Sequence, residues 1–116
     1  DSSSVQHQLK NVQRIHASCD AFAALVGDGT VVTWGPCSCG GDSSAVQDKL
    51  QNVQLIQSSQ CAFAAILATG SVVTWGDHIN GGDCSRVQRQ LNEVEQIEAT
   101  DNAFAAILRD GSVVTW

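Results

Sequence analysis

The side chains of this sequence that could do chemistry are its five cysteines and three histidines. Cys37 and Cys39 form a Cys-x-Cys pair, and together with His78 they have the ligand types of a zinc site. A structural zinc site usually takes four ligands in two pairs, and the sequence offers no second pair. We therefore expect no metal site and no cofactor.

None of the cysteines recurs at the 41-residue spacing at which the rest of the sequence repeats. The equivalent residues in the other copies are polar: Gln60 and Asp101 for Cys19, Asp20 and Asn102 for Cys61, Ser2 and Ser43 for Cys84, and His78 and Asn80 for Cys37 and Cys39. A disulfide framework or a repeated metal site would place its cysteines in register. We expect free thiols in a reducing compartment.

Motifs of catalysis do not occur in the sequence. His7, His16 and His78 fall at three different positions of the repeat, so no histidine is shared by the copies. We find no Gly-x-Ser-x-Gly, paired-carboxylate or phosphate-loop pattern. The Asp-Ser-Ser run at 42–44 is typical of a turn and a helix cap rather than an anion site. We expect that the chain is not an enzyme.

The charge balance narrows the range of partners. Six basic against twelve acidic residues give a formal net charge of −6, and Lys and Arg do not cluster. This balance argues against a phosphate-binding surface, so nucleic acid is not an expected partner. No apolar run approaches the ~20 residues of a membrane span. With 43% hydrophobic residues, the chain is expected to be globular, with no membrane contact.

The sequence contains a tandem repeat, and the fold of this repeat must position the cysteines and histidines. Segments 1–34, 42–75 and 83–116 are identical at 16 of 34 columns, and each ends in Val-Val-Thr-Trp. Nearly all the shared residues are apolar, small or turn-forming, which indicates copies of one unit stacked on one another. We interpret the chain as one repeat domain, 1–116, with repeats at 1–34, 35–75 and 76–116.

Each unit is predicted to contain about three antiparallel strands. In the second copy, the run 61–68 is apolar on both faces, which is typical of a central strand buried between two layers. Thr69-Gly70 then forms a turn into a second strand, 71–75, which is rich in β-branched residues and ends in a Trp. A third strand is expected at 53–59.

The segment 42–50 allows two interpretations. It forms either one or two helical turns, with Asp42 or Ser43 as the cap and Gln47 near a capping-box position, or a fourth, outer strand. The helical turn is favoured, because apolar residues of this segment recur at helical spacing.

The order of these motifs resembles a known repeat. Asp-Gly-Ser-Val-Val-Thr-Trp, then Gly and a short loop to Gly-Gly-Asp, then Val-x-x-Ile and an apolar strand, is similar to the repeat of the regulator of chromosome condensation family. The resemblance implies a mainly β fold in which each repeat is a β-propeller blade. The units are shorter than is usual in that family, and Ala-Phe-Ala replaces its Gly-His-Thr phrase. A WD-repeat propeller fits less well, because Trp is followed by Gly35 and Gly76 rather than Asp. A solenoid fits less well because the unit is dominated by strands and contains a hairpin.

Three blades make an incomplete ring, because a propeller needs about four to eight. Two blade faces would stay open, with the Ala-Phe-Ala columns forming an exposed apolar patch. Either further blades belong to the parent chain, or two chains form a homodimer with a six-bladed ring. In the second case, residues 1–9 would pack on a blade of the other chain.

We expect a non-catalytic scaffold for protein partners, because loops on a rigid repeat usually carry binding specificity. The resemblance implies the recruiting part of a larger protein, such as a HECT-type ubiquitin ligase, or alternatively a guanine nucleotide exchange factor for a small GTPase. The expected location is intracellular, cytoplasmic or nuclear. Candidate binding residues are positions that differ between copies: Pro36, Cys37, Ser38, Cys39, Asp77, His78, Ile79, Asn80, His16, Gln57 and Glu98, with Cys19, Gln60 and Asp101. The alternative is that nothing constrains these positions.

Overall fold

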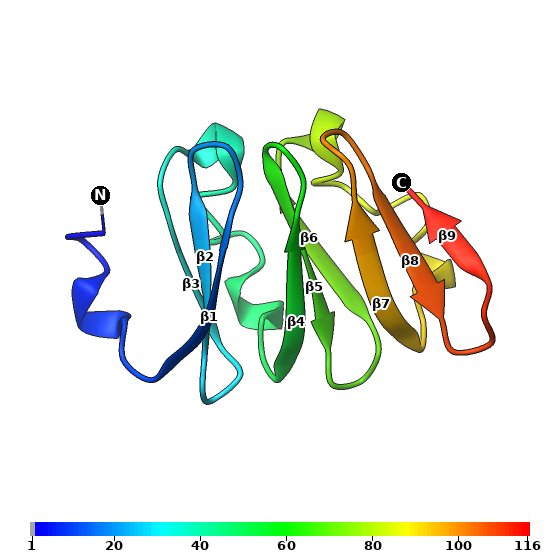
Figure 1. The fold of residues 1–116 in the computed structure, drawn as a ribbon, viewed down its shortest axis with the longest axis horizontal. Helices are drawn as coiled ribbons and strands as arrows, with labels where there is room; N and C mark the ends of the chain where they lie inside the picture. The colour runs from blue at the N-terminus through cyan, green and yellow to red at the C-terminus, as the bar shows by residue number, and fades with distance from the viewer. Residues whose placement is uncertain (1) are drawn as a thin grey trace.

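The computed structural model describes residues 2–116, so Asp1, the first shared repeat position, lies outside the described residues. Within them the chain forms three antiparallel sheets of three strands each, arranged side by side from one terminus to the other (Figure 1). The strands are β1 (Val12–Ala17), β2 (Phe22–Val26), β3 (Val31–Trp34), β4 (Val53–Ser58), β5 (Ala62–Leu67), β6 (Val72–Gly76), β7 (Val94–Ala99), β8 (Phe104–Leu108) and β9 (Val113–Thr115). Short 3-10 helices connect them: η1 (Gln6–Gln8), η2 (Cys37–Cys39), η3 (Gln47–Lys49), η4 (His78–Asn80) and η5 (Gln88–Gln90).

The central strand of the second sheet confirms the strand predicted from the apolar run 61–68. β5 lies between β4 and β6, and the first five of its six residues are buried. Alternate side chains of a strand point to opposite faces, so a strand covered on both faces needs an apolar run without alternation. The predicted hairpin at Thr69-Gly70 and the third strand at 53–59 are also confirmed, because β5 pairs antiparallel with both β6 and β4.

The segment 42–50 contains a single 3-10 turn, η3, and no strand. The helical interpretation is therefore confirmed, but the predicted cap is wrong, since no side chain caps this turn. Asp42 instead accepts a hydrogen bond from the Ser44 N–H (2.9 Å), as in an Asx turn. Asp42 therefore serves the loop before η3, whereas the equally short η4 is capped by Asp77, whose side chain accepts a hydrogen bond from the Ile79 N–H (3.0 Å).

Gln47 replaces the fourth strand at the edge of the first sheet. Its Nε2 donates a hydrogen bond to the Val31 carbonyl (3.1 Å), and its Oε1 accepts one from Ser43 Oγ (2.9 Å). An edge strand with free backbone groups can pair with another chain. A glutamine held on that edge satisfies one of these groups at the cost of a few residues, which explains how the repeat can be short.

Packing between neighbouring sheets forms two hydrophobic cores. We call the contact of the first and second sheets the first junction, and the contact of the second and third sheets the second junction. Each contains an aromatic ring and an isoleucine with 0–1% exposure: Phe63 and Ile56 in the first, Phe104 and Ile97 in the second. The two cores are therefore equivalent copies of one packing arrangement.

β5 contributes to both junctions. Phe63 and Ala65 belong to the first core, and Ala62, Ala64 and Ile66 belong to the second. Small side chains at alternate positions allow the sheets to approach closely while the single large ring fills the remaining space. The structure thus agrees with the packing role that the alanines were expected to have.

Trp75 links the core to the loop after β3. Its ring stacks on Phe63 with a centroid distance of 5.3 Å, and its Nε1 donates a hydrogen bond to the Gly40 carbonyl (3.0 Å). Gly40 has φ of +92° and a Cβ there would lie 2.6 Å from the Phe63 ring. Only glycine therefore allows the loop to cross the ring at this distance.

The outer faces of the first and third sheets are uncovered within residues 2–116. Ile15 is 57% exposed, whereas its equivalents Ile56 and Ile97 are fully buried. Phe22 is also exposed, and Val113 is exposed in the third sheet. The expected open apolar faces are confirmed, but the expectation that they display the Ala-Phe-Ala columns is wrong in part. Phe22 is exposed, whereas Ala21 and Ala23 are buried in the first junction and Phe104 in the second.

The helices of residues 2–116 are single 3-10 turns, so none has the length or the apolar character of a membrane-spanning helix.

Candidate functional site

Two kinds of loop meet at one end of the molecule. The turns after β1, β4 and β7 lie there together with η2 and η4, at the upper edge of Figure 1. Neighbouring sheets stand side by side, so the turns after β1 and β4 lie next to loops of the following repeat. We call this region the loop end, and it brings together side chains that are far apart in the sequence.

Both predicted binding loops lie at the loop end. The last residue of each 3-10 turn is buried, Cys39 in η2 and Asn80 in η4. The remaining predicted residues are exposed or partly exposed: Pro36, Cys37, Ser38, Asp77, His78 and Ile79. Ile79 is 82% exposed, which makes it an apolar side chain offered to solvent. The two loops therefore have an outer, accessible part and one residue that points inward.

His16, Gln57 and Glu98 lie on the first strands of the three sheets, not in loops. Ile15 is exposed on the open face, so the alternation of the strand directs His16 toward the first junction. Its Nε2 is enclosed and has no hydrogen-bond partner. Burial, followed by the nearby charge of Arg14, lowers the pKa of His16. His16 and Gln57 thus lie between sheets, whereas Glu98 is exposed on the uncovered outer face of the third sheet. This placement on strands differs from the rim position expected for the three residues, and their binding role stays a prediction.

The inward-pointing Cys39 meets two other cysteines. Its Sγ lies 3.0 Å from Cys61 Sγ and 3.3 Å from Cys19 Sγ, and the latter two sulfurs are 3.1 Å apart. We call these three residues the sulfur cluster. Among residues 2–116 it is the one group of potential metal ligands close enough to share a single ion. Cys19 is exposed, Cys61 is partly buried and Cys39 is buried, so the cluster opens to solvent on the Cys19 side.

All five cysteines are free thiols, which confirms that part of the prediction. Cys37 and His78, however, are not among the clustered ligands. The pair expected to be the best candidate for zinc is therefore divided, since Cys39 joins cysteines from other loops while Cys37 faces solvent. A 3-10 turn directs neighbouring side chains in different directions, which separates residues two positions apart.

The backbone around the sulfur cluster is held by bonds that do not involve sulfur. Ser18 Oγ donates a hydrogen bond to the Cys39 carbonyl (2.7 Å), which links the first sheet to η2. The Cys19 N–H donates to the Gln60 carbonyl (2.7 Å), which links the turns of the first and second sheets. The three cysteines are thus brought together by the fold whether or not the sulfurs bind anything.

The thiols influence one another's protonation. The pKa of Cys39 is lowered because Cys61 and Cys19 both donate hydrogen bonds to its sulfur. The pKa of Cys61 is raised to about 12 because its own proton is held in hydrogen bonds to Cys39 and Cys19. The first thiolate of the cluster therefore forms at Cys39, with two neighbouring S–H groups pointing to it.

The second junction has carboxamides at the equivalent positions, Gln60, Asn80 and Asn102. Asn80 Nδ2 donates hydrogen bonds to Asn102 Oδ1 (2.8 Å) and to the Asp101 carbonyl (3.0 Å). Ser59 Oγ donates to the Asn80 carbonyl (2.6 Å), as Ser18 does to Cys39. We call Gln60, Asn80 and Asn102 the amide cluster. It crosslinks the second and third sheets through ordinary hydrogen bonds.

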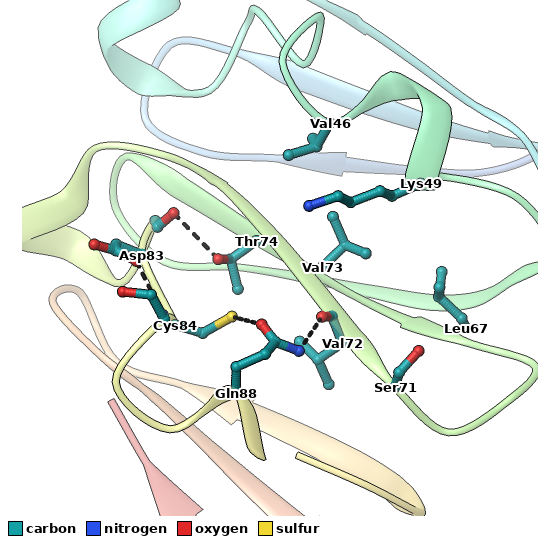
Figure 2. A pocket seen from close by; sticks show the side chains of 12 residues that line it. Val46, Lys49, Leu67, Ser71, Val72, Val73, Thr74, Asp83, Cys84 and Gln88 are labelled. Carbon is teal, nitrogen blue, oxygen red and sulfur yellow. Dashed lines mark hydrogen bonds between the residues drawn. The ribbon is translucent and has the colours of Figure 1, made fainter. Parts of the chain in front are cut away.

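A separate groove of about 530 Å³ runs along β6 on the outer side of the second sheet. Figure 2 shows Lys49 reaching over it from η3, with Cys84 and Gln88 on the opposite wall. Gln88 Nε2 donates to the Val72 carbonyl (3.3 Å), and its Oε1 accepts from the Cys84 thiol (2.9 Å). Gln88 thus covers the edge of β6 as Gln47 covers β3, and the groove follows from the missing fourth strand.

No protein-family model and no curated protein matches this chain. Its structure is similar to yeast RCC1 (Prp20), solved in complex with Kap60, with a TM-score of 0.68 and 21% identity over 90% of this chain and 29% of that one. Human WBSCR16 gives a TM-score of 0.65 and 19% identity over 91% of this chain and 34% of that one. The ectodomain of the Physcomitrella patens receptor kinase CR4 gives 0.62 and 20% identity over 90% and 29%.

The three sheets are blades of an RCC1-like β-propeller. The expectation of propeller blades is thus confirmed, and the chain spans about a third or less of the length of the proteins it resembles. Three blades leave the ring incomplete, with the blade faces around Ile15 and Val113 open.

The proximity of the three cysteines does not show as a repeated position in the sequence, because Cys61 follows the equivalent of Cys19 by one residue. In a propeller, the loop of one blade contacts the loops of the next blade, so side chains that meet there come from different positions of the repeat. A search across adjacent loops of neighbouring blades would have found them.

Proposed function

We propose that this chain is part of a propeller scaffold that binds a protein partner at the loop end and has no catalytic activity of its own. The main observation in support is that each repeat combines buried residues that the copies share with exposed loops that differ between copies. Residues that build the blade, such as Phe63, are identical between copies and buried, whereas the loops 36–39 and 77–80 differ and are mostly exposed. Variable loops on a rigid support are the usual location of binding specificity.

Ile79 is the centre of the proposed binding surface. It is 82% exposed at the tip of η4, where the first loop has Ser38. Asp77 precedes η4 in the same loop, and Asp101 lies in the turn after β7. The whole chain carries a formal net charge of −6. A partner with an apolar side chain surrounded by basic groups would complement this surface. Nucleic acid, which is itself negative, would be repelled.

Structural neighbours support protein binding by this kind of fold. Prp20p of Saccharomyces cerevisiae was solved together with a study of its binding to Gsp1p and histones, and it was also solved bound to Kap60. These are properties of Prp20p. For the present chain we propose a recruiting role within a larger protein, for which a ubiquitin ligase is one setting, and an intracellular location, cytoplasmic or nuclear.

The proposal is tested with two defined probes, core histones and Gsp1p, in separate binding titrations against the 116-residue chain. For at least one probe we expect Ile79→Ser to weaken binding about tenfold or more, which corresponds to about 1.4 kcal/mol. Ile15→Ser is the matched control, because Ile15 is also an exposed isoleucine but lies on the open blade face. Binding of neither probe, or equal losses in both variants, would contradict the proposed surface.

The alternative function is nucleotide exchange on a small GTPase, which the resemblance to the regulator of chromosome condensation repeat implies. The measurement is the rate of fluorescent GDP release from a small GTPase with and without the chain. A rate increase that depends on chain concentration would establish this alternative. Unchanged release together with binding would support the scaffold.

We also propose that the open blade faces are covered either by further blades of the parent chain or by a second copy. The exposed Ile15, Phe22 and Val113 would become buried in both cases. Light scattering over a concentration series distinguishes the two. A stable dimer that Ile15→Asp dissociates would support a six-bladed ring, and a monomer at all concentrations would support blades from the parent chain.

A further inference from the structure

We propose that Cys19, Cys39 and Cys61 bind one thiophilic d10 metal ion, Zn²⁺ or Cu⁺, at the first junction. This inference is independent of the proposed protein-binding function, because the sulfur cluster lies between the blades and Ile79 lies on the outer surface of the next loop. The sequence, in contrast, predicted no metal site, because its cysteines do not recur at equivalent positions of the repeat.

The shape of the cluster favours a metal ion over a disulfide. The three Sγ–Sγ distances are 3.0, 3.1 and 3.3 Å, so the sulfurs form a nearly equilateral triangle. A disulfide would join two sulfurs at about 2.05 Å and leave the third cysteine unused. A single ion above the centre of the triangle uses all three equally.

The size of the triangle is close to what a tetrahedral ion requires. With Zn–S bonds of about 2.3 Å, the sulfurs of a tetrahedral site lie about 3.8 Å apart, and a planar three-coordinate site needs about 4.0 Å. Each edge of the observed triangle must therefore open by about 0.5–0.8 Å for zinc, which small side-chain rotations can supply. The slightly larger opening needed for planar Cu⁺ makes zinc the better geometric fit.

The position of the cluster provides access and a fourth ligand. Cys39 is buried and Cys19 is exposed, so an ion can enter from solvent and keep one coordination position open on that side. Asp20 Oδ2 lies 3.9 Å from Cys19 Sγ, and either this carboxylate or a water molecule can complete a tetrahedron. Binding replaces three S–H bonds with three sulfur–metal bonds and releases three protons to solvent.

The comparison with the amide cluster shows what the metal would supply. At the same place in the second junction, Asn80 crosslinks two blades through hydrogen bonds of 2.8 and 3.0 Å. Thiols are weak donors and weak acceptors, so three S–H groups form a poorer crosslink. Three thiolates around one ion would connect Cys19 of the first blade with Cys61 of the second by strong bonds.

Soft thiolate ligands select the metal. Zn²⁺ and Cu⁺ are favoured by sulfur, whereas Mg²⁺ and Ca²⁺ prefer oxygen ligands. We therefore expect no binding of Mg²⁺ or Ca²⁺ at this site, which gives a simple negative control.

The experiment uses the 116-residue chain, reduced and freed of metal with a chelator. Zn²⁺ is titrated in competition with a chromophoric chelator, and Co²⁺ replaces it for absorption spectra, in which cobalt–thiolate bonds give a charge-transfer band. Cu⁺ is titrated separately without oxygen. We expect one ion per chain with either metal, a cobalt–thiolate band, and a higher thermal midpoint after Zn²⁺ is added.

Single substitutions of the cysteines test which of them bind the metal ion. Cys19→Ser, Cys39→Ser and Cys61→Ser should each weaken zinc binding more than about 100-fold, beyond the 10–100-fold loss caused by removing an outer hydrogen-bond partner. Cys37→Ser and Cys84→Ser are the matched controls, since Cys37 is exposed outside the cluster and Cys84 pairs with Gln88. Both controls should bind zinc as the unchanged chain does.

The triple variant Cys19→Gln, Cys39→Asn, Cys61→Asn copies the amide cluster into the first junction. It should fold, because the second junction already has this arrangement, and it should bind no metal. Absence of metal binding by the unchanged chain would overturn the proposal. So would equal binding by the triple variant, or a disulfide between two of the three cysteines that persists in the presence of reductant.

Discussion

The first and second junctions of this molecule share a backbone and differ in the residues at the loop end. In both, a serine donates to the carbonyl of the inward-pointing loop residue, at 2.7 Å from Ser18 to Cys39 and at 2.6 Å from Ser59 to Asn80. In both, a tryptophan donates to a glycine carbonyl at 3.0 Å, Trp75 in one and Trp116 in the other. The two junctions differ in the neighbouring side chains, which form the sulfur cluster in the first and the amide cluster in the second.

This difference shows which contacts hold the loops of every repeat and which positions vary between the junctions. The framework contacts come from residues that are shared or chemically alike, and they hold the loops in place. The residues at the three cluster positions differ between the junctions although these framework contacts are kept. In the second junction Asn80 donates to Asn102 Oδ1 and to the Asp101 carbonyl, whereas in the first junction the thiols leave strong ligand atoms available.

The largest expected effect tests the shared framework. Phe63→Ala and Phe104→Ala should each lower the free energy of unfolding by about 3–5 kcal/mol, because each removes a ring that fills one junction. Phe22→Ala should cost clearly less, since Phe22 is 39% exposed on the open face. Chemical denaturation measures all three. A near-neutral change for Phe63→Ala would show that the junctions are not the cores described above.

The next effect tests the polar crosslinks. Asn80→Ala should cost about 1–3 kcal/mol, because it removes two hydrogen bonds and leaves Asn102 and the Asp101 carbonyl without that donor. In metal-free, reduced protein, Cys39→Ala should cost less, on the order of the 0.8 kcal/mol for one buried methylene-sized group. Denaturation of the two variants in the same buffer gives the comparison. Equal losses would mean that thiols and amides crosslink the blades equally well.

A smaller effect tests whether the loop supports are equivalent. Ser18→Ala and Ser59→Ala should each cost about 0.5–1.5 kcal/mol, since each loses a hydrogen bond to a loop carbonyl. Ser18→Ala should cost the more of the two, because Ser18 Oγ also accepts a hydrogen bond from the Ala21 N–H (3.2 Å). A larger loss for Ser59→Ala in metal-free protein would break the equivalence of the two junctions. With zinc present, Ser18→Ala should also weaken metal binding, while Ser59→Ala should leave it unchanged.

The smallest effect concerns pH. His16 faces the first junction where Gln57 faces the second, and burial lowers the pKa of His16 below its ordinary value of 6.5. The unfolded chain therefore takes up a proton before the folded chain does, so stability is complete above pH 6.5 and falls as the pH drops below it. The loss should stay under about 1 kcal/mol, because the residue is partly exposed and its charge is screened.

The check is the denaturation midpoint of the chain and of His16→Gln between neutral and mildly acidic pH. The midpoint of the unchanged chain should fall more steeply than that of His16→Gln, which copies Gln57 into the first junction. Parallel curves would show that His16 is not the group responsible.

Much of the fold was predictable from the sequence. The run 61–68, the turn at Thr69-Gly70 and the β-branched strand after it are local patterns, and the structure has each of them as predicted. The cap at Asp42 was not predictable, because the same Asp-Ser-Ser run serves an Asx turn equally well. Turn length does not distinguish the two cases, because η4 is as short as η3 and is capped by Asp77.

The candidate site was predicted only in part. The exposed loops 36–39 and 77–80 were found because they differ between copies, and they lie together at one end. The sulfur cluster was not found, because its members stand at different positions of the repeat and in different loops. Spacing along the chain carries no information about which loop of one blade touches which loop of the next.

That this protein is built of blades follows from its repeats. Apolar, small and turn-forming residues at a 41-residue spacing can bury their surface only by stacking copies of one strand unit. Which side chains meet between the blades depends on the packing of the sheets. Cys19, Cys39 and Cys61 become neighbours because the loops of adjacent blades interlock one residue out of register, and that offset is set by how two packed sheets fit together.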